Sequence, residues 1–343
     1  MSVVLITSDR FADHAVPPGH PERVERAGVM QSVARRWREQ GGAVAAPRMA
    51  TRVELERVHA PEHVDRVAAS AGGTFAFDPD TYASPATYEV ALLAAGAAIV
   101  GVETVLASET LGATRAFALV RPPGHHAGPS RAMGFCLFNN VAIAAAHALS
   151  LGVERVAVVD YDVHHGNGTQ WAFYDDPRVL VVSLHQYPYY PGTGAAGEAG
   201  AGEGEGFTVN VPLEAGATDG DYGLVFRTLV LPVLQEFDPR LLLVSAGFDA
   251  HERDPLGGMR LTTPAFASFA AWLGQVADLS SLGRMVLVTE GGYDLMAFGA
   301  CLQATLRGLA REDTSAAPSP PTERGLMAVE LVRAAQRRYW PGL

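Results

Sequence analysis

Acidic and imidazole side chains gather at one point of the sequence, directly after a run of branched apolar residues. The run ERVAVV leads into Asp160, Asp162 and His164, and glycines follow at Gly166 and Gly168. Apolar runs of this kind are typical of buried strands in a parallel sheet. Residues two apart on a strand share a face, and a carboxylate beside an imidazole is a good pair of zinc ligands. The stretch therefore predicts a metal-binding strand end.

Three further apolar runs also end in polar residues. ATRAFALV leads to His125 and His126 in a Pro/Gly loop, LLLVSAGF leads to Asp249, and MVLVTEGG leads to Tyr293. In open α/β sheets, ligands bind in the crevice beyond the carboxyl ends of the strands. We therefore expect these side chains to be neighbours at one edge of a sheet.

Together, these side chains are the groups that metal-assisted amide hydrolysis requires. Asp162, His164 and Asp249 supply three N/O ligands and leave an open position, which is the pattern of a catalytic zinc site. Zinc lowers the pKa of a bound water to roughly 7 and polarises a carbonyl oxygen. The adjacent histidines can move the proton, and the tyrosine hydroxyl can stabilise the oxyanion.

The remaining pattern predicts one α/β domain. Strand-like and helix-like segments alternate along 343 residues that are 48% hydrophobic, and a Pro-rich stretch, SAAPSPP, occurs only near the end. This length and composition suffice for one large core. We expect a catalytic domain over residues 1–312. Residues 313–343 should form a Pro-rich linker and a C-terminal helix that packs on the core or on a partner.

Charge and composition narrow the function classes. The net charge of −11 disfavours nucleic acid as a direct ligand, because no basic patch is available to neutralise phosphates. It suits a cationic substrate, although ordinary solubility explains it equally well. The start of the chain lacks signal-peptide features, and the apolar run from Val90 contains Glu103, which favours a buried helix over a membrane span. Two cysteines, Cys136 and Cys301, make no disulfide framework. We expect a cytoplasmic protein without membrane contact. The sequence leaves undecided whether it forms a homo-oligomer.

Two segments allow more than one interpretation. The loop from Tyr187 to Gly206 has a glycine-rich second half whose composition is typical of disorder, whereas its residues Tyr189 and Tyr190 are candidates for lining a substrate site. His59 and His63 are four residues apart, as a metal pair on a helix would be. Because Pro61 lies between them in a surface-like segment, we favour a structural role for both histidines.

Six motifs follow one another in order: RPPGHHA, GFCLFNN, VDYDVHHGNGTQ, VSLHQ, SAGFDAHERDPLGGM and TEGGYD. Together they resemble the zinc-dependent histone deacetylases and acetylpolyamine amidohydrolases, over the chain up to about Gly308. The HHGNGTQ form is similar to the class II branch, in its bacterial type. The resemblance implies the arginase–deacetylase fold, which is a single eight-stranded, mainly parallel sheet flanked by helices.

The resemblance also implies roles for the reacting groups. The three ligands named above would bind zinc, and Tyr293 would polarise the acyl carbonyl. His126 would be the general base and acid, oriented by Asn167, and His125 would be its charged companion, oriented by Asp160. Class I relatives have aspartate in place of this asparagine, and a neutral partner should raise the basicity of the histidine less.

A potassium ion behind the zinc is a further implication of the resemblance. Its ligands would be the following side chains and backbone carbonyls: Asp160, Asp162, His164, Ser183 and Leu184.

The resemblance assigns substrate contacts to loop residues, namely Arg26, Asp80, Gly134, Phe135, Tyr190, Leu256, Gly291 and Gly292. Phe135 and Tyr190 would be opposite walls of a tunnel, with tyrosine where many relatives have phenylalanine. Asp80 would anchor a backbone amide of the substrate, and Arg26 would line an acetate exit. The two glycines before Tyr293 would let the tyrosine swing in.

The substrate is the least determined part of this interpretation. Polyamine-selective relatives have a glutamate at the position of Leu256, so we expect an acyl-lysine peptide or protein. The alternative is an acetylpolyamine or another small N-acyl amine, with Glu252 or the acidic loop Glu198–Glu205 as the cation partner. A two-manganese ureohydrolase needs a D-x-H-x-D strand end, whereas this chain has D-x-D-x-H-H. A non-catalytic acetyl-binding protein would need a broken site, whereas all six chemical groups are present.

Overall fold

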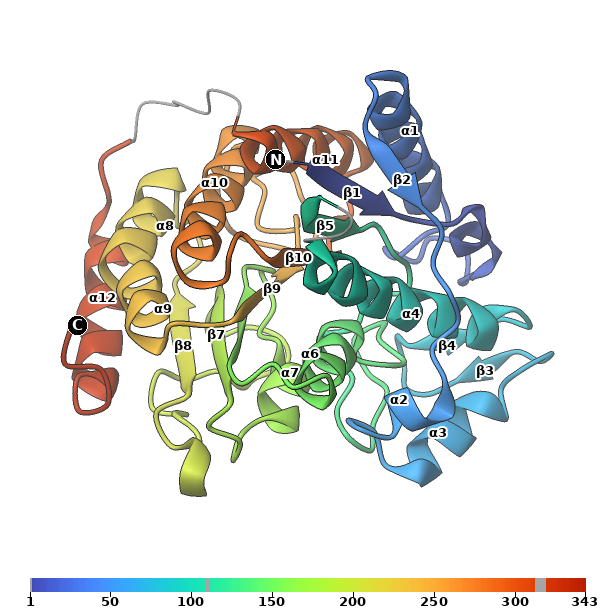
Figure 1. The fold of residues 1–343 in the computed structure, drawn as a ribbon, viewed down its shortest axis with the longest axis horizontal. Coiled ribbons are helices and arrows are strands. Elements are labelled where there is room, and N and C mark those ends of the chain that lie inside the picture. Colours follow the sequence, from blue (N-terminus) through green and yellow to red (C-terminus); the bar gives the residue numbers. More distant parts are fainter. Residues whose placement is uncertain (1, 109–111, 312–318) are drawn as a thin grey trace.

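The chain is built on a parallel sheet whose strands are the apolar runs of the sequence. The computed structural model describes residues 2–108, 112–311 and 319–343. The strands of the large sheet are β1 (Ser2–Ile6), β2 (Ala43–Ala45), β5 (Ala113–Ala118), β6 (Val156–Asp160), β7 (Val179–Gln186), β8 (Thr208–Leu213), β9 (Leu241–Ala246) and β10 (Met285–Thr289). In the described ranges these eight strands form one sheet in the order β2-β1-β5-β10-β9-β6-β7-β8, and every neighbouring pair is parallel (Figure 1). The expected single sheet is confirmed. A small antiparallel pair, β3 (Phe75–Ala76) and β4 (Tyr82–Ala83), lies apart from it.

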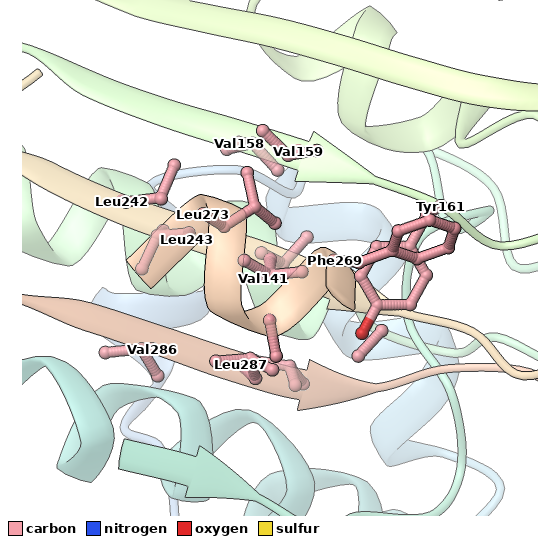
Figure 2. Packing of buried hydrophobic residues seen from close by; sticks show 14 of the residues in the cluster. Val141, Val158, Val159, Tyr161, Leu242, Leu243, Phe269, Leu273, Val286 and Leu287 are labelled. Carbon is pink, nitrogen blue, oxygen red and sulfur yellow. The ribbon is translucent and has the colours of Figure 1, made fainter. Parts of the chain in front are cut away.

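The central strands are apolar almost to their carboxyl ends because helices cover both faces of the sheet. All residues of β6, β9 and β10 are buried. Val158 of β6 lies opposite Leu243 of β9, which lies opposite Val286 of β10. Figure 2 shows this part of the core, with Val141 and Leu273 from two flanking helices packed beside the strands.

The helices are α1 (Glu25–Glu39), α2 (Arg52–Leu55), α3 (Pro61–Ala68), α4 (Thr87–Leu106), α6 (Asn140–Ser150), α7 (Asn167–Ala172), α8 (Asp219–Val225), α9 (Leu231–Phe237), α10 (Thr263–Ser280), α11 (Leu295–Ala310) and α12 (Glu323–Gln336). Short helical turns are η1 (Asp9–Asp13), η2 (Gly202–Gly204) and η3 (Phe226–Val230). Helices α4 and α6 pack together on one face and contact β5, β6, β9 and β10. Helices α10 and α11 pack together on the other face and contact β9 and β1 (Figure 1).

Helix α4 is long and apolar enough to cross a membrane by length and composition alone. However, 67% of its most apolar window is buried inside the protein, and the helix contacts β5 and α6. Its small residues permit this packing: a Cβ atom on Gly96 would lie 1.7 Å from the carbonyl oxygen of Arg48. The helix is therefore part of the core, as the sequence predicts.

The C-terminal helix α12 packs beside the edge of the sheet, against α8 and β8. Gln336 Nε2 donates to the carbonyl oxygen of Thr208, and Trp340 Nε1 donates to that of Gly206, both over 2.9 Å. Residues 312–318, which hold most of the expected Pro-rich linker, lie outside the described residues. The domain division at residue 312 stays a prediction.

Candidate active site

Polar segments follow the carboxyl ends of five adjacent strands, in the order β5, β10, β9, β6 and β7. Asp160, at the end of β6, is the register partner of Ser245 on β9 and of Ser183 on β7. The loops that continue from these strands carry the histidine pair, the tyrosine and the acidic residues singled out in the sequence. Parallel pairing thus brings distant segments to one edge, where a ligand site is expected.

Asp162, His164 and Asp249 form a compact group of metal-ligand atoms. One donor atom from each lies within 4.8 Å of the others, and all three residues are buried. His164 Nδ1 lies 3.2 Å from Asp162 Oδ1 and 3.2 Å from Asp249 Oδ2. Backbone amides hold the remaining carboxylate oxygens: Val163 N donates to Asp249 Oδ1 over 2.9 Å, and Gly291 N donates to Asp162 Oδ2 over 2.8 Å.

This donor set fits a divalent cation such as zinc. Asp249 Oδ2 is buried and, although His164 Nδ1 lies 3.2 Å away, it accepts no hydrogen bond in the part of the chain that the structure describes, and a buried oxygen without a hydrogen bond is costly. Burial and the nearby charge of Asp162 raise the pKa of Asp249 to about 7. A dication between the two carboxylates would remove their repulsion, and two oxygens with one imidazole nitrogen suit zinc.

The sequence interpretation expects the two glycines before Tyr293 to let the tyrosine swing. In the structure, space and backbone conformation already require glycine at these positions. A Cβ atom on Gly291 would lie 1.9 Å from Asp249 Oδ2 and 2.7 Å from Asp162 Oδ2, so only glycine fits against the two carboxylates. Gly292 has φ +124°, a conformation that favours glycine. Gly291 therefore lets the loop after β10 approach the metal-ligand group.

The adjacent histidines are held by chemically different partners. His125 Nδ1 lies 2.9 Å from Asp160 Oδ2, and His126 Nδ1 lies 2.7 Å from Asn167 Oδ1. Both partner atoms are acceptors, so each Nδ1 carries the proton. Nε2 of His126 is then left as an acceptor on a ring that lines the cavity described below.

The surroundings also give the two imidazole rings different protonation states. Burial opposes charge on His125, but the carboxylates of Asp160 and Asp162 outweigh it and raise the pKa of His125 well above its ordinary value. Burial, together with the charges of His125 and His164, lowers the pKa of His126 well below its ordinary value. One imidazole is therefore cationic and the other neutral.

Tyr293 is buried at the base of the site with its hydroxyl available. This hydroxyl makes no hydrogen bond within residues 2–108, 112–311 and 319–343, whereas the backbone N–H of Tyr293 donates to Asp254 Oδ2 over 2.6 Å. Its ring packs edge-to-face on Phe135, with the ring centroids 5.8 Å apart. Burial and the nearby Asp249 raise the pKa of Tyr293 well above its ordinary value, so the hydroxyl stays protonated as a donor.

Arg26 anchors the loop that carries Tyr293. It is fully buried, its guanidinium lies 5.2 Å from the centroid of the Tyr293 ring, and its Nε donates to the carbonyl oxygen of Gly292 over 2.8 Å. Glu22, also buried, forms ion pairs with Arg26 over 2.8 Å and with Arg121 over 2.6 Å. A place for Arg26 along an acetate exit stays a prediction.

Glu290 is a buried residue of the site that the sequence interpretation missed. Its Oε2 accepts from the backbone N–H of Gly124 over 2.6 Å and of His125 over 3.1 Å, and its Oε1 accepts from the Ser245 hydroxyl over 3.0 Å. It therefore fixes the backbone of the histidine loop to β9 and β10. Its position directly after an apolar strand was the available signal.

A cavity of about 210 Å³ opens above these groups. It is lined by Asp80, His126, Gly134, Phe135, His164, Tyr189, Tyr190, Leu256 and Tyr293. Five of the expected substrate contacts, namely Asp80, Gly134, Phe135, Tyr190 and Leu256, therefore lie at this cavity. Arg26, Gly291 and Gly292 are not among the residues that line it. A wider groove of about 600 Å³ adjoins the cavity and shares Leu256 and Tyr293 with it.

The acidic loop does not face this cavity. Both carboxylate oxygens of Glu198 accept hydrogen bonds from within the fold, and Glu205 accepts from the Tyr339 hydroxyl over 2.5 Å. The idea that this loop supplies a cation partner to the cavity is therefore wrong for these two residues. The disorder suggested by its composition is also wrong, because the loop has specific contacts.

Three of the expected potassium ligands, Asp160, Ser183 and Leu184, lie on the neighbouring strands β6 and β7, and the other two lie in the loop after β6. Asp160 and Ser183 are register partners of β6 and β7. Asp160 Oδ1 accepts from the backbone N–H of Asp162 over 3.0 Å, and the Ser183 hydroxyl lies 3.0 Å from His185 Nδ1. The potassium site stays a prediction.

Two other sets of side chains that could bind a metal have structural roles instead, namely the pair His59 and His63 and the group Glu54, Glu103 and His147. His59 Nδ1 donates to the carbonyl oxygen of Gly128 over 3.0 Å, and its Nε2 accepts from the backbone N–H of Asn139 over 2.9 Å. It thus joins two loops inside the protein. Its segment lies at the surface, with Glu62, Asp65 and Arg66 exposed, and His59 and His63 belong to its buried side. The group Glu54, Glu103 and His147 is an ion-pair cluster, because Arg48 binds both carboxylates, over 2.6 and 2.8 Å.

Comparison with known proteins adds independent observations. The family model "Histone deacetylase domain" matches residues 19–309. A "Probable deacetylase" of Archaeoglobus fulgidus is 39% identical over 85% of this chain and 81% of its own length. "Polyamine deacetylase HDAC10" of Homo sapiens is 39% identical over 94% of this chain and 49% of its own length. The crystal structure of the HDA15 HD domain superposes with a TM-score of 0.92 at 38% identity, covering 100% of this chain and 98% of that one.

Several curated relatives are longer than this chain, which spans 62% of histone deacetylase 15 of Arabidopsis thaliana and 54% of a chloroplastic histone deacetylase 10 of Oryza sativa.

Proposed function

The chain belongs to the histone deacetylase family, and from this premise we propose that it is a zinc-dependent amidohydrolase that removes acetyl or other acyl groups from the ε-amine of lysine in peptides or proteins. One observation carries the proposal: His164 of the three-residue metal-ligand group, the neutral His126 and Tyr293 line one cavity with aromatic walls.

Asp162, His164 and Asp249 would hold the zinc ion. When bound there, zinc supplies Lewis acidity, which polarises the acyl carbonyl and makes a water molecule more acidic. The backbone amides of Val163 and Gly291 keep the two carboxylates pointing at the site, so the ligands are oriented before the metal arrives.

The protein's own groups move the protons. Nε2 of His126 accepts the proton of the attacking water and returns it to the leaving amine. The Tyr293 hydroxyl donates to the carbonyl oxygen as negative charge develops there. His125, paired with Asp160, keeps a positive charge beside the site and stabilises the same oxyanion. Asn167 fixes which nitrogen of His126 faces the substrate.

The cavity lining favours an acyl-lysine substrate. Phe135 and Tyr190 offer aromatic faces to the uncharged methylene chain of lysine, and Leu256 adds an apolar side chain. Asp80 is the one carboxylate among the described residues that line the cavity outside the metal ligands. In this proposal it would accept from a backbone amide of a peptide substrate.

Acetylpolyamine is the second candidate, and Asp80 is also the observation that favours it. A carboxylate at the cavity could pair with the distal ammonium of a polyamine, and the net charge of −11 would attract such a cation. The human relative named a polyamine deacetylase shows that this family includes such enzymes.

A potassium ion belongs to the same proposal. Asp160 and Ser183, with the backbones of Asp162, His164 and Leu184, would hold it beside the zinc ligands, where it would stabilise the backbone turn after β6.

A panel of acyl-lysine peptides and acetylpolyamines, compared by kcat/KM on the zinc-loaded protein, tests the proposal. We expect the highest kcat/KM for an acyl-lysine peptide. A higher value for an acetylpolyamine would reverse the choice of substrate, and no hydrolysis of any member by a protein that binds one zinc ion would contradict the proposed activity.

A further inference from the structure

The loop between β7 and β8 forms one wall of the cavity. Tyr189 stacks on His164 with their ring centroids 5.6 Å apart, and Tyr190 packs edge-to-face on His126 at 5.2 Å. Both tyrosines line the cavity. The position of this loop therefore sets the width of the cavity beside the metal ligand and the general base.

Glu198 ties the glycine-rich part of this loop to the centre of the protein. Its Oε1 accepts from the backbone N–H groups of Gly194 over 3.0 Å and Ala195 over 3.1 Å, and its Oε2 accepts from Gln170 Nε2 over 2.7 Å. Its own carbonyl oxygen accepts from Asn210 Nδ2 over 3.1 Å. One side chain thus closes the loop on itself and joins it to helix α7.

In the chain of hydrogen bonds that ends at Glu198, every donor points toward the Glu198 carboxylate. Because a carboxylate only accepts, Gln170 must present its Nε2 to Glu198 and its Oε1 to the other side. That Oε1 accepts from Asn210 Nδ2 over 2.7 Å and from His165 Nε2 over 3.0 Å. His165 Nδ1 is then the acceptor for the Thr193 hydroxyl, 2.8 Å away. A neutral amide side chain at position 198 would bring two donors face to face.

The loop also approaches the histidines beneath it without space for a side chain. Gly194 has φ +95°, and a Cβ atom there would lie 2.3 Å from His185 Nε2 and 2.7 Å from His165 Cγ. His185 Nε2 donates to the carbonyl oxygen of Gly194 over 2.9 Å. The backbone that follows the two tyrosines is therefore fixed at this point.

We propose that Glu198 is a positioning residue for the deacetylation reaction: its carboxylate holds the loop against α7 and so keeps the wall formed by Tyr189 and Tyr190 at the width that binds the substrate chain. The substrate chemistry rests on the function proposed above, whereas the hydrogen-bonded anchor itself does not.

The test compares Glu198→Gln with Glu203→Gln in the full chain. Glu203 lies in the same loop, is exposed, and has no hydrogen bond or ion pair to any residue that the structure describes. We expect Glu198→Gln to raise KM for the best substrate of the panel about tenfold, as a mismatched polar pair would, while kcat stays within about twofold. Amide hydrogen exchange at Gly194 and Ala195 should also accelerate, whereas Glu203→Gln should match the wild type in both measurements.

A double variant, Glu198→Gln with Gln170→Glu, exchanges the two side chains and should restore the wild-type properties. The new carboxylate at position 170 accepts from the amide introduced at position 198, from His165 and from Asn210, so every donor again meets an acceptor. We expect the double variant to restore both KM and slow exchange to within about threefold of the wild type. If Glu198→Gln keeps the wild-type KM, loses kcat instead, or is not rescued by the exchange, the positioning role is overturned.

Failure of the proposed function would be recognised separately. If the wild type hydrolysed acetylpolyamines rather than acyl-lysine peptides, the substrate proposal would fail, whereas the KM comparison with the polyamine and the hydrogen-exchange comparison would still decide the role of Glu198.

Discussion

His126 Nδ1 donates to the amide oxygen of Asn167 over 2.7 Å, so the proposed general base is oriented by a neutral side chain. The neighbouring histidine has a carboxylate in the equivalent place. The carboxylates of Asp160 and Asp162 raise the pKa of His125, whereas burial and the charges of His125 and His164 lower the pKa of His126, although the two ring centroids are only 4.0 Å apart.

Replacing Asn167 by aspartate should move the acid limb of the pH–rate profile to higher pH. Catalysis needs neutral His126, whose pKa is lowered below its ordinary value by burial and by the charges of His125 and His164. A carboxylate beside Nδ1 would raise that pKa, so the protonated, inactive form would persist to higher pH. The measurement is kcat/KM against pH, and an acid limb that does not move would contradict the assignment of His126 as the base.

Removing each histidine in turn should give unequal losses. His126→Ala removes the proton acceptor and should lower kcat by about a hundredfold or more. His125→Ala removes only a neighbouring charge and should cost less. Steady-state kinetics of both variants, each checked for one bound zinc ion, decide the ranking. A larger loss in His125→Ala would mean that the two roles are exchanged.

Tyr293→Phe should bind zinc and substrate normally but lose about a hundredfold in kcat, because it lacks the hydroxyl that stabilises the oxyanion. The ring contact with Phe135 would remain, so the fold should be unchanged. Turnover and KM are measured on the same zinc-loaded sample. Full activity in this variant would remove the tyrosine from the mechanism.

Leu256→Glu should shift preference toward acetylpolyamines. The side chain lines the cavity, so a carboxylate there could pair with the distal ammonium of the substrate. The ratio of kcat/KM for an acetylpolyamine to that for an acyl-lysine peptide should rise about tenfold or more. Glu252→Gln, on the exposed surface outside the cavity, serves as the control. If the ratio is unchanged in Leu256→Glu, or if it changes in Glu252→Gln, position 256 does not determine the choice between the two substrates.

The sequence predicted the sheet and the grouping of Asp162, His164 and Asp249 because both depend on short-range patterns. Asp162 and Asp249 each follow an apolar strand, and parallel strands bring such ends together without further information. Conversely, the buried ion pair of Glu22 with Arg121 joins two segments that are 99 residues apart in the sequence. No local pattern distinguishes such a glutamate from a solvated one.

The loops were the least predictable part for the same reason. The composition of residues 192–206 indicates disorder, but hydrogen bonds from Glu198 to Gln170 and to nearby backbone amides fix the loop. His59 belongs to a segment that looks exposed, yet it is buried between two loops. Both outcomes depend on tertiary contacts that periodicity does not contain.

The central claim is that Asp162, His164 and Asp249 hold one divalent metal ion, and metal content tests it most directly. After equilibrium dialysis against zinc, the wild type should contain one zinc ion per chain. Asp249→Asn, which keeps the size of the side chain and the acceptor for Val163, should contain close to none while remaining folded by circular dichroism. Retention of one zinc ion per chain by a folded Asp249→Asn variant would contradict the account.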